Sequence, residues 1–94
     1  MDAVDTPIVR KVRIRNRRGL HARAAAKLVQ TLEPFEAEFM VTNDSMTVSG
    51  RSIMGLMMLA AAPGIELVLS ASGPDARAAL DAVVALVQSR FGED

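Results

Sequence analysis

A single histidine lies where the sequence changes from a strand-like pattern to a helix-like one, and its neighbours suit chemistry with an anion. His21 follows Gly19, which permits a sharp turn, and stands in the first turn of the expected helix. Backbone N–H groups there lack intrahelical partners and the helix dipole is positive, so a bound anion is stabilised. Arg23 adds a planar fork of donors that fits phosphate oxygens. The pattern favours a phosphoryl site, with His21 as nucleophile and the backbone of Ala22 and Arg23 as phosphate binder.

Simpler interpretations of this histidine compete with the chemical one. A lone histidine is more often a surface or hydrogen-bonding residue than a nucleophile. A metal site is disfavoured because the sequence contains one His and no Cys to share an ion, and no bound cofactor is expected. The residue types alone therefore leave the role of His21 open.

Three segments resemble HPr, the family of histidine phosphocarriers of the bacterial phosphotransferase system. Gly-Leu-His-Ala-Arg at residues 19–23 resembles the active-site signature of this family. Arg-Ser-Ile-Met-Gly-Leu-Met at residues 51–57 is similar to its regulatory-serine segment, and residues 64–73 are similar to its last strand and the following turn. The resemblance runs from about Val9 to the C-terminus, and three segments in register are far more specific than five residues.

This resemblance implies a role for His21. An HPr protein accepts a phosphoryl group on the ring nitrogen Nδ1 of its histidine from phosphorylated enzyme I. It then passes the group to a histidine of an enzyme IIA-type protein, and phosphoenolpyruvate is the ultimate donor. By resemblance, His21 is the phosphoryl acceptor and Arg23 stabilises the phosphate. The phosphohistidine is labile, which suits a carrier rather than a stand-alone enzyme.

Ser52 has both a structural and a regulatory interpretation. It is a good N-cap for a short helix, and capping, worth roughly 1 kcal/mol, is enough to explain a serine there. The resemblance adds regulatory phosphorylation of Ser52 in a cell that contains an HPr kinase/phosphorylase. The apolar residues after it form either core or an adaptable docking surface, because Met side chains repack at little cost. The resemblance implies that the surface receiving enzyme I and the acceptor includes Leu20, Ala22, Ile53, Met54 and Met57.

One position departs from the usual HPr pattern. Many members carry proline after the arginine, whereas this sequence has Ala24, followed by two more alanines. Alanine is an excellent helix former and keeps its N–H, so the chemistry is expected to survive. The alanine-rich version is closer to the nitrogen-related branch of the system, and the choice between that branch and sugar transport stays open.

Three other functions fit parts of the sequence. A small acyl-phosphate hydrolase also needs an arginine near backbone N–H groups, but it turns over without a partner protein. A purely regulatory module binds its targets differently in two phosphorylation states. A nucleic-acid-binding module is suggested only by the basic first third of a chain whose formal net charge is zero. Because no aromatic residue accompanies that basic cluster, base stacking is disfavoured and no nucleic-acid partner is expected.

Hydrophobic periodicity predicts the element order β-α-β-β-α-β-α. We expect strands at residues 8–14, 35–42, 46–48 and 65–71, and helices at 22–32, 53–59 and 74–91. Pro74 is expected at the first position of the last helix with Asp75 in its first turn, and Gly92 is expected to end that helix. In the first helix the residues expected at helical spacing on the buried face are Ala22, Ala25, Ala26, Val29 and Leu32. The pattern cannot choose the strand order, and a ferredoxin-like order fits nearly as well.

The resemblance to HPr implies an α+β fold, the open-faced β-sandwich. In this fold a four-stranded antiparallel sheet is covered on one face by two long helices and one short helix. The chain has 94 residues, half of them apolar, which is enough for one small core. We expect one HPr-like phosphocarrier domain, 1–94, with residues 1–7 as a flexible N-terminal extension. The sequence has neither a long apolar run nor a signal peptide, so we expect a cytoplasmic protein without a membrane partner. We also expect a monomer.

Overall fold

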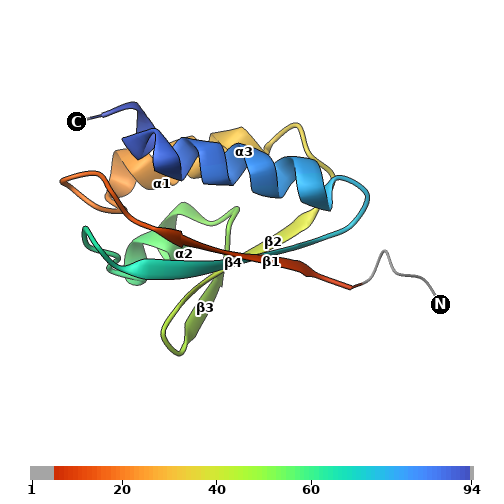
Figure 1. Ribbon diagram of the computed structural model, residues 1–94, viewed down its shortest axis with the longest axis horizontal. Helices are drawn as coiled ribbons and strands as arrows, with labels where there is room; N and C mark the ends of the chain where they lie inside the picture. Colours follow the sequence, from red (N-terminus) through yellow and green to blue (C-terminus); the bar gives the residue numbers. More distant parts are fainter. Residues whose placement is uncertain (1–5, 94) are drawn as a thin grey trace.

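The computed structural model describes residues 6–93, so residues 1–5 of the expected N-terminal extension lie outside the described residues. No helix in the described part is long and apolar enough to cross a membrane. The elements follow the predicted order and add a short 3-10 helix at the end (Figure 1). They are β1 (Ile8–Arg13), α1 (Ala22–Leu32), β2 (Glu38–Asn43), β3 (Met46–Ser49), α2 (Ile53–Met58), β4 (Glu66–Ser72), α3 (Ala76–Gln88) and η2 (Arg90–Gly92).

The four strands form one antiparallel sheet in the order β1-β4-β2-β3. β4 pairs with β1 on one side, where Val12 lies opposite Leu67, and with β2 on the other side, where Val41 lies opposite Leu69. β2 and β3 form the predicted hairpin, with Asp44 in the turn at a φ of 58°. The pairing decides the strand order that periodicity left open, and the predicted open-faced sandwich is confirmed.

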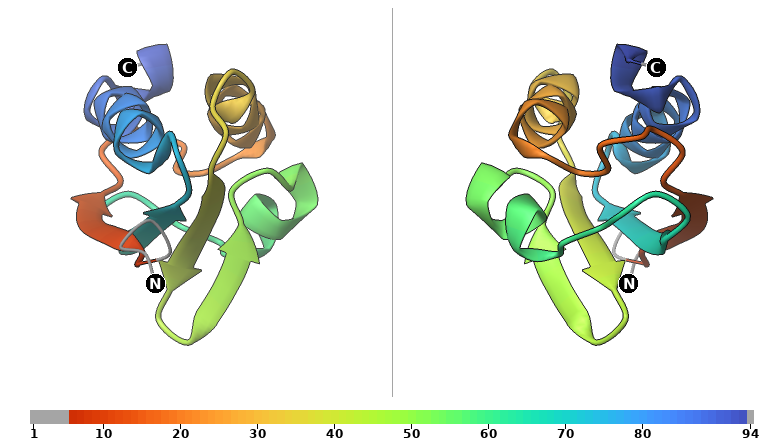
Figure 2. Two further views of the ribbon diagram at one scale, coloured as in Figure 1. Left: turned by 90° about the vertical axis from the view of Figure 1, so that its right-hand side faces the viewer. Right: turned by 90° about the vertical axis from the view of Figure 1, so that its left-hand side faces the viewer.

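One face of the sheet carries the core. α1 and α3 lie side by side over this face, and α2 packs against α1 and β3 at the edge (Figure 2). Alternate residues of the central strands point at the helices, as the period of two in a strand requires. The fully buried side chains of these strands are Phe39, Val41, Leu67, Leu69 and Ala71.

The buried face of α1 differs from the predicted one. Its buried residues are Ala24, Ala25, Leu28 and Leu32. Ala22 is exposed, and Ala26 and Val29 are only half-buried. Three consecutive alanines carry no directional information, so the larger side chains Leu28 and Leu32, spaced four residues apart, decide which face turns to the sheet.

β2 begins later than the alternation of apolar residues predicts, at Glu38 rather than at residue 35. The Arg51 side chain explains the delay, because it donates to the carbonyl oxygens of Phe35 and Ala37 at 2.8 and 2.9 Å. A third bond from its Nη1 reaches the carbonyl oxygen of Leu32 at 3.0 Å. The guanidinium thus holds the chain between α1 and β2 in a loop whose carbonyls are not available to the sheet.

α3 also begins later than predicted, and the placement of Pro74 at its first position is wrong. Pro74 belongs to a turn that follows Gly73, whose φ is 112°, and the helix starts at Ala76. Asp75 is the N-cap residue rather than part of the first turn, and its side chain makes no capping bond. Instead its Oδ2 accepts a 2.7 Å hydrogen bond from the Glu36 N–H, so the carboxylate ties α3 to the loop before β2.

The end of α3 differs from the prediction as well. α3 ends at Gln88, and Arg90, Phe91 and Gly92 follow with φ values of 60°, 56° and 73°. A left-handed conformation costs about 1–2 kcal/mol for each residue that has a Cβ atom, so this turn requires compensating contacts. Phe91 is fully buried, and Lys27 Nζ donates a 2.6 Å hydrogen bond to its carbonyl oxygen. Gly92 therefore ends this turn and not the helix.

We predict that Gly50→Ala destabilises the protein by about 1–3 kcal/mol of unfolding free energy, measured by urea denaturation. A Cβ atom added at Gly50 would lie 2.8 Å from Phe39 Cδ1 and 3.1 Å from Leu32 Cδ1, and both of these side chains are fully buried. In a Phe39→Leu background the same substitution should cost less, because the ring that it strikes is gone. An equal cost in both backgrounds contradicts this steric explanation.

Candidate functional site

His21 is the N-cap residue of α1, with φ −78° and ψ 179°, so its predicted place at the start of a helix is correct. Its side chain makes no capping bond and is 18% exposed. The first helical bond runs from the Ala25 N–H to the His21 carbonyl oxygen at 2.8 Å. The N–H groups of Ala22, Arg23 and Ala24 therefore have no acceptor inside the helix, which leaves them available to an anion.

The loop before His21 is held by a close backbone approach. Gly19 has a φ of 68°, and a Cβ atom there would collide with the carbonyl oxygen of Ala61. The same oxygen accepts a 2.9 Å hydrogen bond from the Leu20 N–H. Leu20 is only 5% exposed, so it belongs to the core and forms the floor beside His21 rather than an exposed docking contact. Leu20, His21, Arg18 and residues 60–63 line a shallow depression of 250 Å³.

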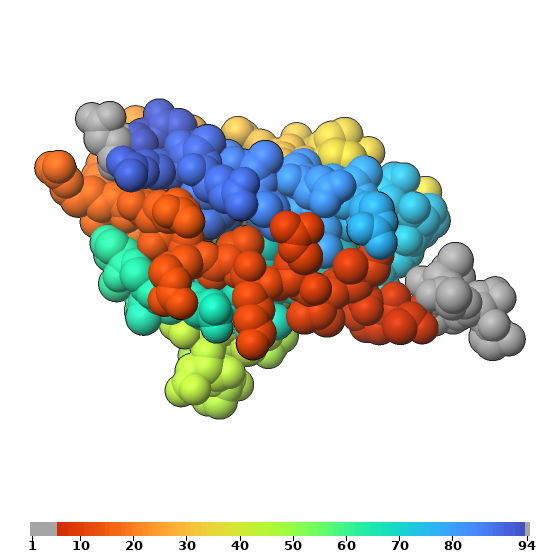
Figure 3. Space-filling model, in the orientation of Figure 1, coloured from red at the N-terminus to blue at the C-terminus, as the bar shows by residue number. Residues whose placement is uncertain are grey.

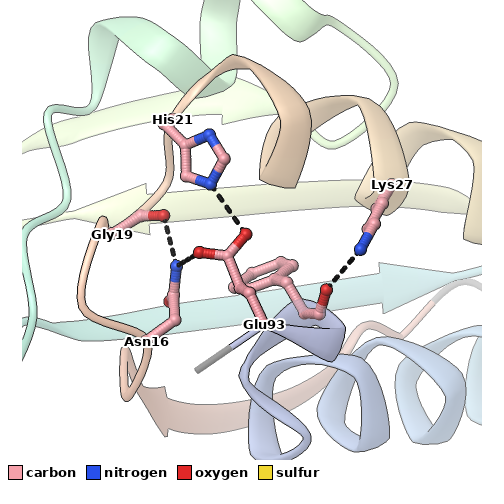
Figure 4. A network of polar contacts seen from close by, with 6 residues as sticks. Asn16, Gly19, His21, Lys27 and Glu93 are labelled. Atoms are coloured by element: carbon pink, nitrogen blue, oxygen red, sulfur yellow. Dashed lines mark hydrogen bonds and ion pairs between the residues drawn. The ribbon is translucent and has the colours of Figure 1, made fainter.

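The imidazole of His21 is held by the far end of the chain (Figure 4). Its Nε2 lies 2.8 Å from Oε2 of Glu93, and the other carboxylate oxygen of Glu93 accepts a 3.0 Å hydrogen bond from Asn16 Nδ2. Asn16 Nδ2 also donates to the carbonyl oxygen of Gly19 at 2.7 Å. Glu93 and Asn16 were not among the residues that sequence reasoning selected. No periodicity or motif marks them, and only the return of α3 toward the start of α1 brings them to His21.

The charge of Glu93 determines which ring nitrogen of His21 is free. The hydrogen bond from Asn16 lowers the pKa of Glu93 most, followed by the hydrogen bond from His21, while the charges of His21 and Arg18 act in the same direction. Glu93 is therefore an ionised carboxylate at neutral pH and can only accept hydrogen bonds. Nε2 of His21 must then be the donor, which leaves the lone pair of the neutral ring on Nδ1.

Arg23 is the second residue of α1, and its side chain is exposed. Within residues 6–93 it makes neither a side-chain hydrogen bond nor an ion pair, so its guanidinium is free to meet an anion at the start of α1. Further arginines lie on β1 and on the loop that leads to His21. Figure 3 shows these basic segments in red and orange below the blue α3.

Ser52 is the N-cap residue of α2, as predicted. Its Oγ accepts a 2.9 Å hydrogen bond from the Gly55 N–H, and the side chain is half-buried. A cap of this kind uses Ser52 Oγ as an acceptor only, so the hydroxyl proton takes no part in it.

The apolar residues of α2 are mostly on the surface, which excludes the interpretation that they are simply core. Met54 is 76% exposed, and among the described helix residues only Leu56 is buried. We call the exposed apolar side chains of α2 the methionine surface. It consists of Ile53, Met54, Met57 and Met58.

Residues 6–93 contain no group of three or more His, Cys, Asp and Glu side chains that could hold an ion. The ring of His21 has one side-chain partner, the Glu93 carboxylate at Nε2, and Asn16 bonds to that carboxylate rather than to the ring.

Known proteins resemble this chain over nearly its whole length. The family described as PTS HPr component phosphorylation site matches residues 8–89. The phosphocarrier protein HPr of Treponema pallidum is 45% identical over 87 residues, which is 93% of this chain and 99% of that protein. The phosphocarrier protein NPr of Shewanella violacea is 43% identical and covers 94% of this chain, with 97% of its own length matched.

Solved structures agree with the sequence relatives. HPr-C-His from Thermoanaerobacter tengcongensis superposes with a TM-score of 0.88 at 41% identity, covering 93% of this chain and 98% of its own. The matched family region includes His21, Arg23 and Ser52. Glu93 lies beyond residue 89, outside that region.

Proposed function

Because the chain belongs to the HPr family, the phosphocarriers of the bacterial phosphotransferase system, we propose that His21 accepts the phosphoryl group on Nδ1 and passes it on. The observation that carries this proposal is the contact between Nε2 and the Glu93 carboxylate at 2.8 Å. It occupies one nitrogen as a donor and leaves the lone pair of the other as the nucleophile. The product would be a phosphohistidine phosphorylated at Nδ1.

The start of α1 supplies the groups that would hold the phosphate. The first-turn N–H groups of Ala22 and Arg23 have no helical acceptor, and the dipole of an eleven-residue helix favours negative charge at this end. The Arg23 side chain would add charge-assisted hydrogen bonds to the phosphoryl oxygens during transfer. Phosphoryl transfer needs little covalent help from the protein, so positioning and charge stabilisation of this kind are the expected means of catalysis.

HPr proteins work with enzyme I and enzyme IIA of the phosphotransferase system. We infer that enzyme I, charged from phosphoenolpyruvate, phosphorylates His21 and that an enzyme IIA-type protein receives the group. The relatives named HPr and NPr are similar to this chain to nearly the same degree, 45% and 43% identity, and phosphoryl transfer is common to both.

The methionine surface is our candidate for the contact with both partners, together with Ala22. Its four side chains are 41–76% exposed on one short helix, which is an unusual amount of large apolar surface for so few residues. Unbranched Met side chains adapt to different partner surfaces, which a carrier with a donor and an acceptor requires. Leu20 would act from below, by supporting the loop that presents His21.

We propose Ser52 as a regulatory phosphorylation site for an HPr kinase/phosphorylase. A phosphate on Ser52 would meet free N–H groups at the start of α2, so modification should not unfold the domain. It would place nearly two negative charges next to Ile53 and Met54 of the proposed docking surface.

A cytoplasmic monomer is the form in which we propose that the protein works. Phosphoenolpyruvate, the expected donor, is a cytoplasmic metabolite. β1 pairs with β4 of the same chain over six residues, and Arg10 of β1 forms a 3.7 Å ion pair with Asp81 of α3. The edge strand β1 therefore has its pairing partner in the same chain and needs no strand from a second copy.

His21→Ala should abolish phosphorylation by enzyme I and phosphoenolpyruvate while leaving the fold intact, because it removes the proposed nucleophile. Intact mass at neutral and acid pH measures the effect, since a phosphohistidine is acid-labile. Wild-type protein should gain one acid-labile phosphate and the variant none. Enzyme I-dependent labelling of His21→Ala would contradict the assignment, and turnover of an acyl phosphate by wild-type protein alone would favour the hydrolase.

Arg23→Lys should slow phosphoryl transfer about tenfold at unchanged melting temperature. The change keeps the charge but removes the bidentate fork, so it should cost less than the 10²–10³-fold typical for loss of a whole donor. Arg77→Lys, at an exposed position of α3, is the matched control. Wild-type transfer rates in Arg23→Lys would argue against the role, and a large drop in melting temperature would indicate a structural one.

Ser52→Asp and Met54→Glu should each raise, roughly tenfold, the concentration of this protein at which its phosphorylation by enzyme I is half-saturated. That change corresponds to about 1.4 kcal/mol of docking free energy. Both place negative charge on the methionine surface, where an apolar or acidic partner loses binding through desolvation and repulsion. Val9→Glu, an exposed apolar residue of β1, is the control. If Ser52→Asp lowers the saturated rate and leaves half-saturation unchanged, the effect of Ser52 is not on docking.

A further inference from the structure

We propose that Glu93 is a positioning residue for phosphoryl transfer, which acts by holding the Nε2 proton of His21 throughout the reaction. The carboxylate would orient the ring with Nδ1 toward the phosphoryl group and would stabilise the positive charge that the ring acquires. This inference rests on the proposed function, because it assigns Glu93 a part in phosphorylation at His21.

The first argument is the completeness of the contact. Both carboxylate oxygens of Glu93 are engaged, Oε2 with His21 Nε2 at 2.8 Å and Oε1 with Asn16 Nδ2 at 3.0 Å. Asn16 is fully buried, and its second amide bond goes to the Gly19 carbonyl oxygen at 2.7 Å. Asn16 lies in the loop before His21, so this loop holds the Glu93 carboxylate in place, and the carboxylate holds the His21 ring (Figure 4).

The second argument is that the fold maintains this contact against local preferences. Two non-glycine residues, Arg90 and Phe91, adopt left-handed conformations in the turn that leads through Gly92 to Glu93. Asn16 Oδ1 is buried without a hydrogen-bond partner among the described residues. Strained backbone and unsatisfied polar atoms are rare, and they persist where surrounding structure enforces a functional geometry.

The third argument is the anchoring of the turn. Phe91 is fully buried in the hydrophobic core, and Lys27 of α1 donates a 2.6 Å hydrogen bond from Nζ to its carbonyl oxygen. A simple glycine stop would have ended α3 without these contacts. With them, the chain after α3 is directed across to the start of α1, where Glu93 reaches His21.

The chemical step balances without any additional reactant. The Nδ1 lone pair of neutral His21 attacks phosphorus, a new N–P bond forms, and the bond between phosphorus and the phosphorylated atom of enzyme I breaks with its electron pair going to enzyme I. The His21 ring becomes positively charged, and its Nε2 proton remains in the hydrogen bond to Glu93. In the onward step a nucleophile of the acceptor protein forms a bond to phosphorus, the N–P electron pair returns to Nδ1, and the ring is again neutral. The buried aspartate of Ser-His-Asp triads stabilises an imidazolium in the same way.

The test compares Glu93→Gln with wild type and with Glu33→Gln, an exposed carboxylate at the end of α1. Glu93→Gln keeps the size of the side chain and removes its charge. We expect its saturated rate of phosphorylation by enzyme I to fall at least about tenfold at unchanged half-saturation, since positioned proton partners commonly contribute 10²-fold or more. Nitrogen NMR of the full chain should show that neutral His21 loses its single tautomer. Glu93→Asp should recover part of the rate, and Glu33→Gln should match wild type.

Two results would overturn the proposal. One is a wild-type saturated rate in Glu93→Gln. The other is a slow Glu93→Gln protein whose melting temperature is lowered and whose His21 tautomer is unchanged, because that combination indicates a structural role. If instead wild-type protein acquires no phosphate on His21, the proposed function itself fails, and the two failures are thus distinguishable.

Discussion

The burial of one sheet face under two antiparallel helices is the constraint on which the rest of this structure depends. The core contains few aromatic rings and is built from Ala, Val, Leu and Ile with Phe39 and Phe91, so it is filled only when α1 and α3 lie close together and close to the sheet. Because the helices run in opposite directions, α1 starts and α3 ends at the same end of the molecule (Figure 1). That arrangement, together with the turn after α3, brings residues 16–23 and residue 93 into one site.

The site combines a rigid part with an adaptable one. The His21 ring is held by the Glu93 carboxylate, which Asn16 also bonds, and the loop before His21 is held by the close approach of Gly19 to Ala61. The neighbouring α2 presents exposed methionines, whose side chains repack easily. Phosphoryl transfer requires accurate placement of the reacting nitrogen, whereas exchange between a donor and an acceptor protein requires a surface that tolerates two shapes. In the function we propose, these two requirements fall on different elements of the fold.

Unfavourable local features are concentrated beside His21. The buried Asn16 leaves one acceptor unsatisfied, which costs about 1–3 kcal/mol. The left-handed Arg90 and Phe91 add a further cost of about 1–2 kcal/mol each. The buried ring of Phe91 offsets part of this, since burial of a large apolar side chain contributes about 1.5–3 kcal/mol. The cost of these features is thus compensated by the hydrophobic core, most of which lies away from His21.

The order of the elements, the place of His21 at a helix start and the capping role of Ser52 were predictable from the chain, because each depends on residues close together in it. Spacing and turn chemistry act locally, and the HPr motifs are local as well. The strand order and the buried face of α1 depend on packing between distant parts of the chain. Consecutive alanines give α1 no preferred face, and the packing of Leu28 sets the face that is buried. The late starts of β2 and α3 also depend on distant parts of the chain, because Arg51 and Asp75 bond to distant backbone groups. The contact of Glu93 with His21 joins residues 72 positions apart, and no local pattern can encode it, since it exists only after two helices have packed on one sheet.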